Sequence, residues 1–223
     1  MADKEILIFV EGPSDKVFLE VYLYFLEDFP IKNFKVKDVK GKDNLSKRLL
    51  EIEKYDKTLI IFDANKDYES NKKEILTVVS KRKQTISEEQ IFLFPNNQDD
   101  GDLETLLLKI AKHDEFLKCF ESYLECIKSK EHHEPIKNIR KNMLYAYLEV
   151  FEPQKFFQYK WDTNNKKQEK CLIDDKGKIK EKNKEEYEKL KEAIDFSSNS
   201  LIPLKNFLGQ FAENKQKTNP KIF

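Results

Sequence analysis

The first half of the chain alternates short apolar runs with longer stretches in which apolar and polar residues recur at helical spacing. Apolar runs of strand length occupy residues 6–10, 34–39, 58–62 and 91–94. Between them, one-sided apolar patterns typical of helices cover residues 15–28, 41–55 and 68–83. Strands that alternate with helices favour parallel pairing with right-handed crossovers. The pattern therefore predicts an α/β fold with a four-stranded, mainly parallel sheet and helices on both faces.

The predicted helices each present an apolar stripe. In the stretch 41–55 the residues expected to face inward are Leu45, Leu49, Leu50 and Ile52.

After Pro95 the strand patterns disappear and only helical patterns remain. They cover residues 103–110, 115–129, 136–152 and 202–211, and the third of these carries Met143, Tyr147 and Val150 on its apolar stripe. A polar stretch at 162–184 offers little for burial and is expected to be a mobile excursion. We therefore expect an α/β core over residues 1–110 and a mainly helical C-terminal region over residues 111–223.

The charge balance limits the classes of partner. The chain has 41 basic and 41 acidic residues, so its formal net charge is zero and no whole-chain field draws it to nucleic acid. Nearly all cations are lysines, whereas arginine is the usual reader of base edges. Any DNA or RNA partner is therefore expected to be held locally and without sequence specificity. A protein partner or a homo-oligomer is equally compatible with this composition.

Nothing in the chain points to a membrane or to an oxidising compartment. No run approaches the roughly 18 consecutive apolar residues of a membrane helix, and the first residues lack the basic head of a signal peptide. The three cysteines have no metal-site spacing and are odd in number. We expect a cytoplasmic protein without membrane contact.

Acidic side chains follow two of the predicted strands at the point where each strand ends. Glu11 follows the first apolar run, and Asp63, Asn65 and Asp67 stand at alternate positions at the end of the third. Alternate side chains of an extended backbone point the same way, and neighbouring parallel strands share their carboxyl edge. Such oxygen ligands suit Mg²⁺, which needs only one or two protein carboxylates. The pattern predicts a Mg²⁺ or Mn²⁺ site, and its simpler alternative is a strand followed by an Asx turn.

The residues after Glu11 add the features of a phosphate site. Gly12 allows close approach of a ligand to the backbone, and Ser14 or Asp15 can cap the helix that follows. The N-terminal amides of that helix favour an anion. Gly12, Ser14 and Asp15 are therefore candidates for binding a substrate phosphate near Glu11, although Asp15 also fits a purely capping role.

The two strand ends together resemble the TOPRIM superfamily of topoisomerases, primases and related nucleases. Its members carry one strand that ends in Glu-Gly, as residues 11–12 do, and a later strand that ends in Asp-x-Asp, to which residues 63–65 (Asp-Ala-Asn) correspond. The resemblance covers about residues 5–105. It implies that Glu11 acts as the general acid or base of phosphoryl transfer and that Asp63 holds Mg²⁺.

The chain departs from this family at one position. Asn65 stands where the family has its second aspartate, so either Asp67 or the acidic stretch after the fourth run supplies a carboxylate in its place, or the metal site is weakened. Glu104 is the preferred additional metal ligand, while Asp102 fits the cap of the helix that begins near Leu103. The segment 95–107 also resembles small bacterial proteins with a TOPRIM-like core and no established activity.

Three functions follow from these patterns. The first is a Mg²⁺-dependent nucleic-acid phosphodiester hydrolase with Glu11 and Asp63 at its centre. The second is a binding protein on the same fold, impaired in catalysis because of Asn65. The third is a receiver-like switch in which Asp63 accepts a phosphoryl group.

Overall fold

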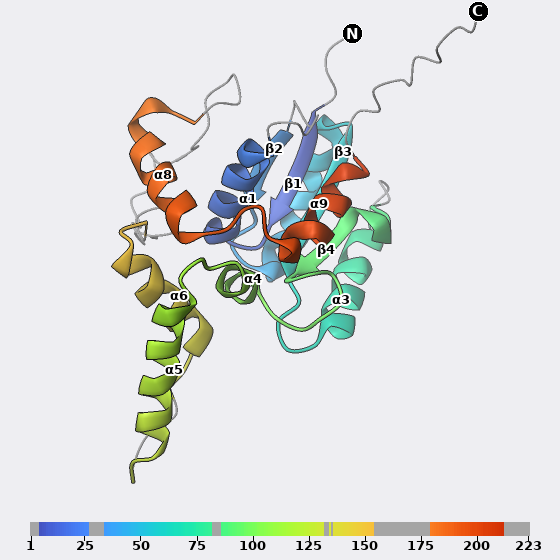
Figure 1. The fold of residues 1–223 in the computed structure, drawn as a ribbon. Helices are drawn as coiled ribbons and strands as arrows, with labels where there is room; N and C mark the ends of the chain where they lie inside the picture. Colours follow the sequence, from blue (N-terminus) through green and yellow to red (C-terminus); the bar gives the residue numbers. More distant parts are fainter. Residues whose placement is uncertain are drawn as a thin grey trace, which may run out of the picture.

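The four predicted strands form one parallel sheet in the order β2-β1-β3-β4 (Figure 1). The computed structural model describes residues 5–26, 34–81, 86–131, 134, 136–153 and 179–211. The strands are β1 (Ile6–Val10), β2 (Phe34–Asp38), β3 (Lys57–Asp63) and β4 (Ile91–Phe94). Each lies within a residue or so of its apolar run, and the expected α/β class is confirmed.

Helices connect and follow the strands. They are α1 (Pro13–Phe25), α2 (Leu45–Arg48), α3 (Tyr68–Ser80), α4 (Leu103–Lys109), α5 (Asp114–Lys128), α6 (Ile139–Val150), α8 (Lys184–Ala193) and α9 (Ile202–Gly209). Short 3₁₀ segments occupy Lys42–Asn44, Leu49–Lys54, Glu88–Gln90, Glu181–Asn183 and Asn199–Leu201. Among the described helices, none has the length and apolar character needed to cross a membrane.

Each face of the sheet has its own hydrophobic cluster. The segment 42–54 and α3 cover one face, and α1, α4 and the C-terminal helices cover the other. Phe207 of α9 packs against Phe92 of β4 with ring centroids 5.3 Å apart, as expected for a helix that closes over the sheet. Tyr147 of α6 donates its hydroxyl to the carbonyl of Ala193 at 2.6 Å. The helical C-terminal part therefore buries its side chains together with those of the sheet.

Two predicted inward positions are wrong. Leu50 is 63% exposed, because the single helix expected over residues 41–55 is in fact a short α-helix followed by a 3₁₀ segment from Leu49 onward. The tighter 3₁₀ turn changes the direction of each following side chain. Val150, the last residue of α6, is 55% exposed. Most of the predicted excursion at 162–184 lies outside the described residues.

The outer edge of β4 is closed by the turn that follows the strand. The side chain of Asn97 accepts a hydrogen bond from the Leu93 N–H at 3.0 Å, and the Asn97 N–H donates to the Leu93 carbonyl at 2.7 Å. The Ile91 N–H donates to the carbonyl of Glu88. The N–H groups of Leu93 and Ile91 and the Leu93 carbonyl, which an edge strand would leave free, are thus satisfied within the chain.

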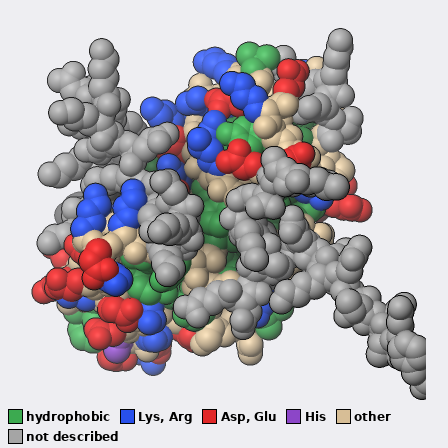
Figure 2. Space-filling view, turned by 90° about the horizontal axis from the view of Figure 1, so that it is seen from above, with side chains coloured by type: hydrophobic (Ala, Val, Ile, Leu, Met, Phe, Trp, Pro, Cys, Tyr) green, Lys and Arg blue, Asp and Glu red, His purple; other side chains and the backbone are tan. Residues whose placement is uncertain are grey.

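Charges of both signs are interspersed on the face where β1 begins. Figure 2 views the molecule from above, and lysine, arginine and acidic side chains lie next to one another there. Among the described residues visible on this face, basic and acidic side chains are thus mixed.

Candidate active site at the carboxyl edge of the sheet

The two acidic strand ends lie on neighbouring strands. Glu11 is the first residue after β1, and Asp63 is the last residue of β3. The strands pair directly, with Val10 opposite Ile61. Because both strands run in the same direction, their carboxylates reach the same edge of the sheet, as the sequence predicts.

Two helices bring further carboxylates to this edge. Asp15 stands in the first turn of α1 and Glu104 in the first turn of α4. Burial raises the pKa of Asp63, and the nearby charges of Asp15, Glu11 and Glu104 raise it further. The site is therefore a cluster of four carboxylates from four elements, which we call the acid cluster: Glu11, Asp15, Asp63 and Glu104.

Asp15 is a buried member of the acid cluster as well as a helix cap. It is 7% exposed, and its Oδ2 accepts a hydrogen bond from the Gly12 N–H at 2.7 Å. A Cβ at Gly12 would lie 3.3 Å from that oxygen, so glycine allows this close approach. Gly12 belongs to the turn that was expected to bind a phosphate, and its N–H is occupied by Asp15. Ser14 lies partly buried in the same turn.

The start of α4 is joined to Asp63 by a backbone hydrogen bond. The Leu103 N–H donates to Asp63 Oδ1 at 3.0 Å, and Glu104 is the next residue. Asp102 caps the helix by accepting from the Thr105 N–H at 2.8 Å, which confirms the capping role considered for it. These bonds place Glu104 beside the strand end, where the sequence analysis expected an additional ligand.

Glu11 has one satisfied and one unsatisfied carboxylate oxygen. Burial raises the pKa of Glu11, and the backbone N–H of Asp63 together with the charge and backbone N–H of Lys42 oppose this rise in part. Its Oε2 is nevertheless buried without a hydrogen-bond partner. A buried oxygen of this kind costs free energy unless a proton, a cation or a bound donor satisfies it.

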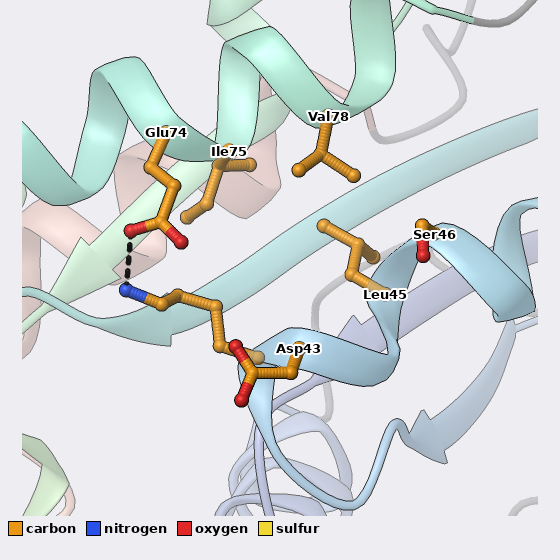
Figure 3. A pocket seen from close by; sticks show the side chains of 7 residues that line it. Asp43, Leu45, Ser46, Glu74, Ile75 and Val78 are labelled. Carbon is orange, nitrogen blue, oxygen red and sulfur yellow. Dashed lines mark hydrogen bonds and ion pairs between the residues drawn. The ribbon is translucent and has the colours of Figure 1, made fainter.

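The position of Lys42 is fixed by α3. Its Nζ lies 2.7 Å from Asn71 Oδ1 and 2.6 Å from Glu74 Oε2, at the rim of a small hollow between α3 and the segment 42–46 (Figure 3). Lys42 therefore lines this hollow, and its charge also acts on the Glu11 carboxylate. The sequence pattern did not single out Lys42. The one available signal is its place after Gly41, in the short loop that follows the second strand.

All four carboxyl groups of the acid cluster have raised pKa values, and burial is the largest cause for each of them. Burial and the nearby charges of Glu104 and Glu11 raise the pKa of Asp15 to about 7. The pKa of Asp63 lies well above its ordinary value, and those of Glu11 and Glu104 are also raised. The folded protein therefore retains protons here that the same groups lose in water.

Asn65 and Asp67 do not extend along β3 as predicted. Asn65 has a φ of 56°, which breaks the extended backbone, and its side chain is exposed. Asp67 is exposed and caps α3 by accepting from the Ser70 N–H at 2.9 Å. The premise that their side chains alternate on one face with Asp63 is wrong, and Asp67 caps a helix instead.

Asn65 instead connects the loop of β3 to the loop of β4. Its N–H donates to the Gly101 carbonyl at 2.6 Å, and the Gly101 N–H donates to the Asn65 carbonyl at 2.7 Å. Asparagine is one of the residues that tolerate the left-handed conformation that this bridge requires. The bridge holds the loop that leads into α4 next to Asp63.

Gly101→Ala is expected to lower the free energy of unfolding by about 1–3 kcal/mol. Gly101 has a φ of 145°, and a Cβ there would come within 3.0 Å of both Pro95 Cδ and Thr105 Oγ1. Urea denaturation measures the effect. Gly41→Ala is the matched control, because Gly41 has a φ of 97° but no atom within 4 Å of its Cβ position. Equal losses in the two variants would contradict the importance of the contacts.

A second cation reaches the site from α6. Arg140 donates through Nε and Nη2 to Asp102 Oδ2 at 3.2 and 2.8 Å. Its charge and that of Lys141 lower the pKa of Glu104, although burial outweighs them. Sequence spacing gave no signal for this contact, because the two residues are 38 positions apart.

The acid cluster fits a divalent cation by its donor chemistry. It offers hard carboxylate oxygens, including the unsatisfied Oε2 of Glu11. In the described part of the chain, no group of three or more His, Cys, Asp or Glu side chains is arranged to hold a metal ion directly. Mg²⁺ usually takes one or two carboxylates and keeps several waters, so a pair of these residues is a sufficient donor set.

The fold and the site together define an α/β protein with one buried carboxylate, that of Asp15, and three partly buried ones at the carboxyl edge of a parallel sheet. The model of a protein family described as "Protein of unknown function (DUF3226)" matches residues 5–213, and the chain belongs to this family. Comparisons with curated proteins and with solved structures give no match.

Proposed function

We propose that this protein is a Mg²⁺-dependent phosphodiester hydrolase that acts on nucleic acid, with a TOPRIM-like active site. The observation that carries the proposal is the convergence of four carboxylates with raised pKa values on one sheet edge. Groups of like charge that lie close together with perturbed pKa values are characteristic of active sites. When bound, Mg²⁺ would supply charge stabilisation at the phosphoryl oxygens and an activated water.

Glu11 is the proposed general acid or base. Its raised pKa brings the group closer to neutral pH, where proton transfer is most effective. Its unsatisfied Oε2 gives the proton an atom to occupy. Backbone N–H groups hold the rest of the carboxylate in place, so the side chain needs little rearrangement to act.

Asp63 and Glu104 are the proposed metal ligands, in place of the predicted pair formed by Asp63 with Asn65 or Asp67. Asp63 is oriented by the Leu103 N–H, and Glu104 follows in the same turn of α4. The charge of Lys42 acts on Glu11 and the charges of Lys141 and Arg140 act on Glu104, so these cations are suited to neighbouring phosphates of the substrate.

The proposal is tested with Glu11→Gln. We expect the wild-type protein to cleave single- or double-stranded DNA or RNA when Mg²⁺ or Mn²⁺ is added, and the variant to lose at least about 10²-fold of that rate. Gel assays of labelled substrates measure the rate. Glu69→Gln is the control, because Glu69 is exposed in the first turn of α3. Cleavage that survives in Glu11→Gln rejects the proposed role.

A binding protein on the same fold is the second candidate. The feature that favours it is Asn65, which lies outside the acid cluster where the TOPRIM family has an aspartate. In this case calorimetry detects no Mg²⁺ binding at millimolar concentration. An Asp63-dependent isotherm eliminates this candidate. The receiver-like alternative has its own test. If it holds, acetyl phosphate phosphorylates Asp63 and increases the intact mass of the protein.

A further inference from the structure

A groove lies along the outer edge of the sheet, between β4 and α9, which are side by side in Figure 1. We call it the β4–α9 groove. Its volume is about 630 Å³, which lies within the range of roughly 300–1,000 Å³ that is typical of ligand sites. Phe92 of β4 and Phe207 of α9 pack against each other and form its buried apolar wall. The turn 96–98 and the segment 87–89 complete the lining.

Side-chain amides stand on two sides of this apolar wall. Gln98 belongs to the turn after β4, whereas Asn206 and Gln210 belong to α9 and its C-terminal end. All three residues are exposed, and within the described part of the chain their side chains make no hydrogen bond. Each amide offers donors and an acceptor in one plane. The β4–α9 groove therefore presents uncharged groups that can both donate and accept hydrogen bonds.

The charges in the groove do not suit a phosphate. Lys72 Nζ pairs with Glu88 Oε1 at 2.7 Å and also donates to the Tyr68 hydroxyl at 3.0 Å, so this lysine is already neutralised. Glu89, which is exposed, adds a negative charge to the lining. It would repel a phosphate but can accept a hydrogen bond from the exocyclic amino group of a base. The lining thus suits a flat, uncharged ring with donors and acceptors on its edge, which describes a nucleobase.

One end of the groove lies at the carboxyl edge of the sheet. β4 pairs with β3, and Phe94 is opposite Asp63 of the acid cluster. Neighbouring strands are about 4.8 Å apart, and the turn 96–98 follows Phe94 almost at once. A nucleic-acid strand with a phosphate at the acid cluster can therefore place a neighbouring base in the β4–α9 groove.

We infer that the β4–α9 groove binds an unpaired base of a nucleic-acid strand and thereby favours single-stranded over duplex substrates. The side-chain amides of asparagine and glutamine bind base edges through both of their polar atoms. Bases in a single strand can turn outward to meet such groups, whereas bases in a duplex are stacked and paired. The choice of nucleic acid as the polymer rests on the proposed function, but binding in the groove requires neither metal nor cleavage.

Fluorescence anisotropy with a short labelled DNA single strand, and with the duplex of the same sequence, tests the inference. EDTA is present, so that cleavage does not interfere. The wild-type protein is expected to bind the single strand more tightly than the duplex. Asn206→Ala is expected to weaken single-strand binding at least about fivefold, and so is Gln98→Ala on the other side of the groove. Asn199→Ala is the matched control, because Asn199 is an exposed asparagine just before α9 and outside the groove lining.

Three results overturn the inference: no binding of the single strand by the wild-type protein, equal affinities of Asn206→Ala and Asn199→Ala for it, or an equally large loss for the duplex. In each case the amides serve a ligand other than an unpaired base. The hydrolase proposal is judged separately. A protein that shows the expected binding in EDTA but cleaves nothing when Mg²⁺ is added contradicts only that proposal. A protein that cleaves both forms equally, with Asn206→Ala unaffected, contradicts only the role of the groove.

Discussion

Asp63→Asn is expected to abolish Mg²⁺ binding and, at the same time, to make the metal-free protein more stable. The ionised Asp63 carboxylate lies near those of Asp15, Glu11 and Glu104, and burial raises the energy of its charge. The amide removes this repulsion but can still accept the hydrogen bond from Leu103. We expect a gain on the order of 1–3 kcal/mol in the free energy of unfolding at pH 7.

Two measurements on the same variant separate its effects. Calorimetry is expected to show a loss of at least about 10²-fold in Mg²⁺ affinity, and urea denaturation the gain in stability. Asp67→Asn is the matched control, because Asp67 is exposed and caps α3. Asparagine caps helices as well as aspartate does, so neither quantity should change. If Asp67→Asn also removes Mg²⁺ binding, Asp67 is a ligand and our assignment of the site is wrong.

The stability of the metal-free protein is expected to fall as pH rises from about 4 to 7. The pKa of Asp15 goes from an ordinary value of 3.8 to about 7 in the folded protein, and the other members of the acid cluster shift in the same direction. Between the two values the folded state holds more protons than the unfolded chain, so raising the pH favours unfolding. Above pH 7 this contribution of Asp15 levels off.

Urea denaturation at pH 5 and pH 8 measures this dependence. We expect the protein to be more stable at pH 5 by an amount on the order of a few kcal/mol, and Asp15→Asn to reduce the difference. Mg²⁺ is expected to stabilise the protein more at pH 8 than at pH 5, because it binds the ionised carboxylates. Stability that is flat or rises between pH 5 and pH 8 would contradict the burial of ionisable carboxylates at this site.

The sheet and the neighbouring strand ends could be predicted because their signals are local. Central strands such as β1 and β3 are covered on both faces, so they appear as continuous apolar runs. Acids directly after two such runs reach one edge whenever the runs pair in parallel. Glu104 followed from the same logic, since its helix begins shortly after the fourth strand.

The remaining features of the site depend on backbone geometry and on distant contacts. Asn65 adopts its left-handed conformation in the bridge to Gly101, and no local sequence pattern predicts that Gly101 is its partner. Arg140 reaches Asp102 only because α6 packs beside α4. The exposure of Leu50 results from a change of helix type, which leaves the apolar spacing in the sequence unaltered.

The closed outer edge of β4 has a consequence for assembly. A strand from another molecule would have to form a ladder there, but Asn97 and Glu88 already satisfy the N–H groups of Leu93 and Ile91. The sheet therefore does not grow across this side into intermolecular β-structure, which is the usual start of fibril formation.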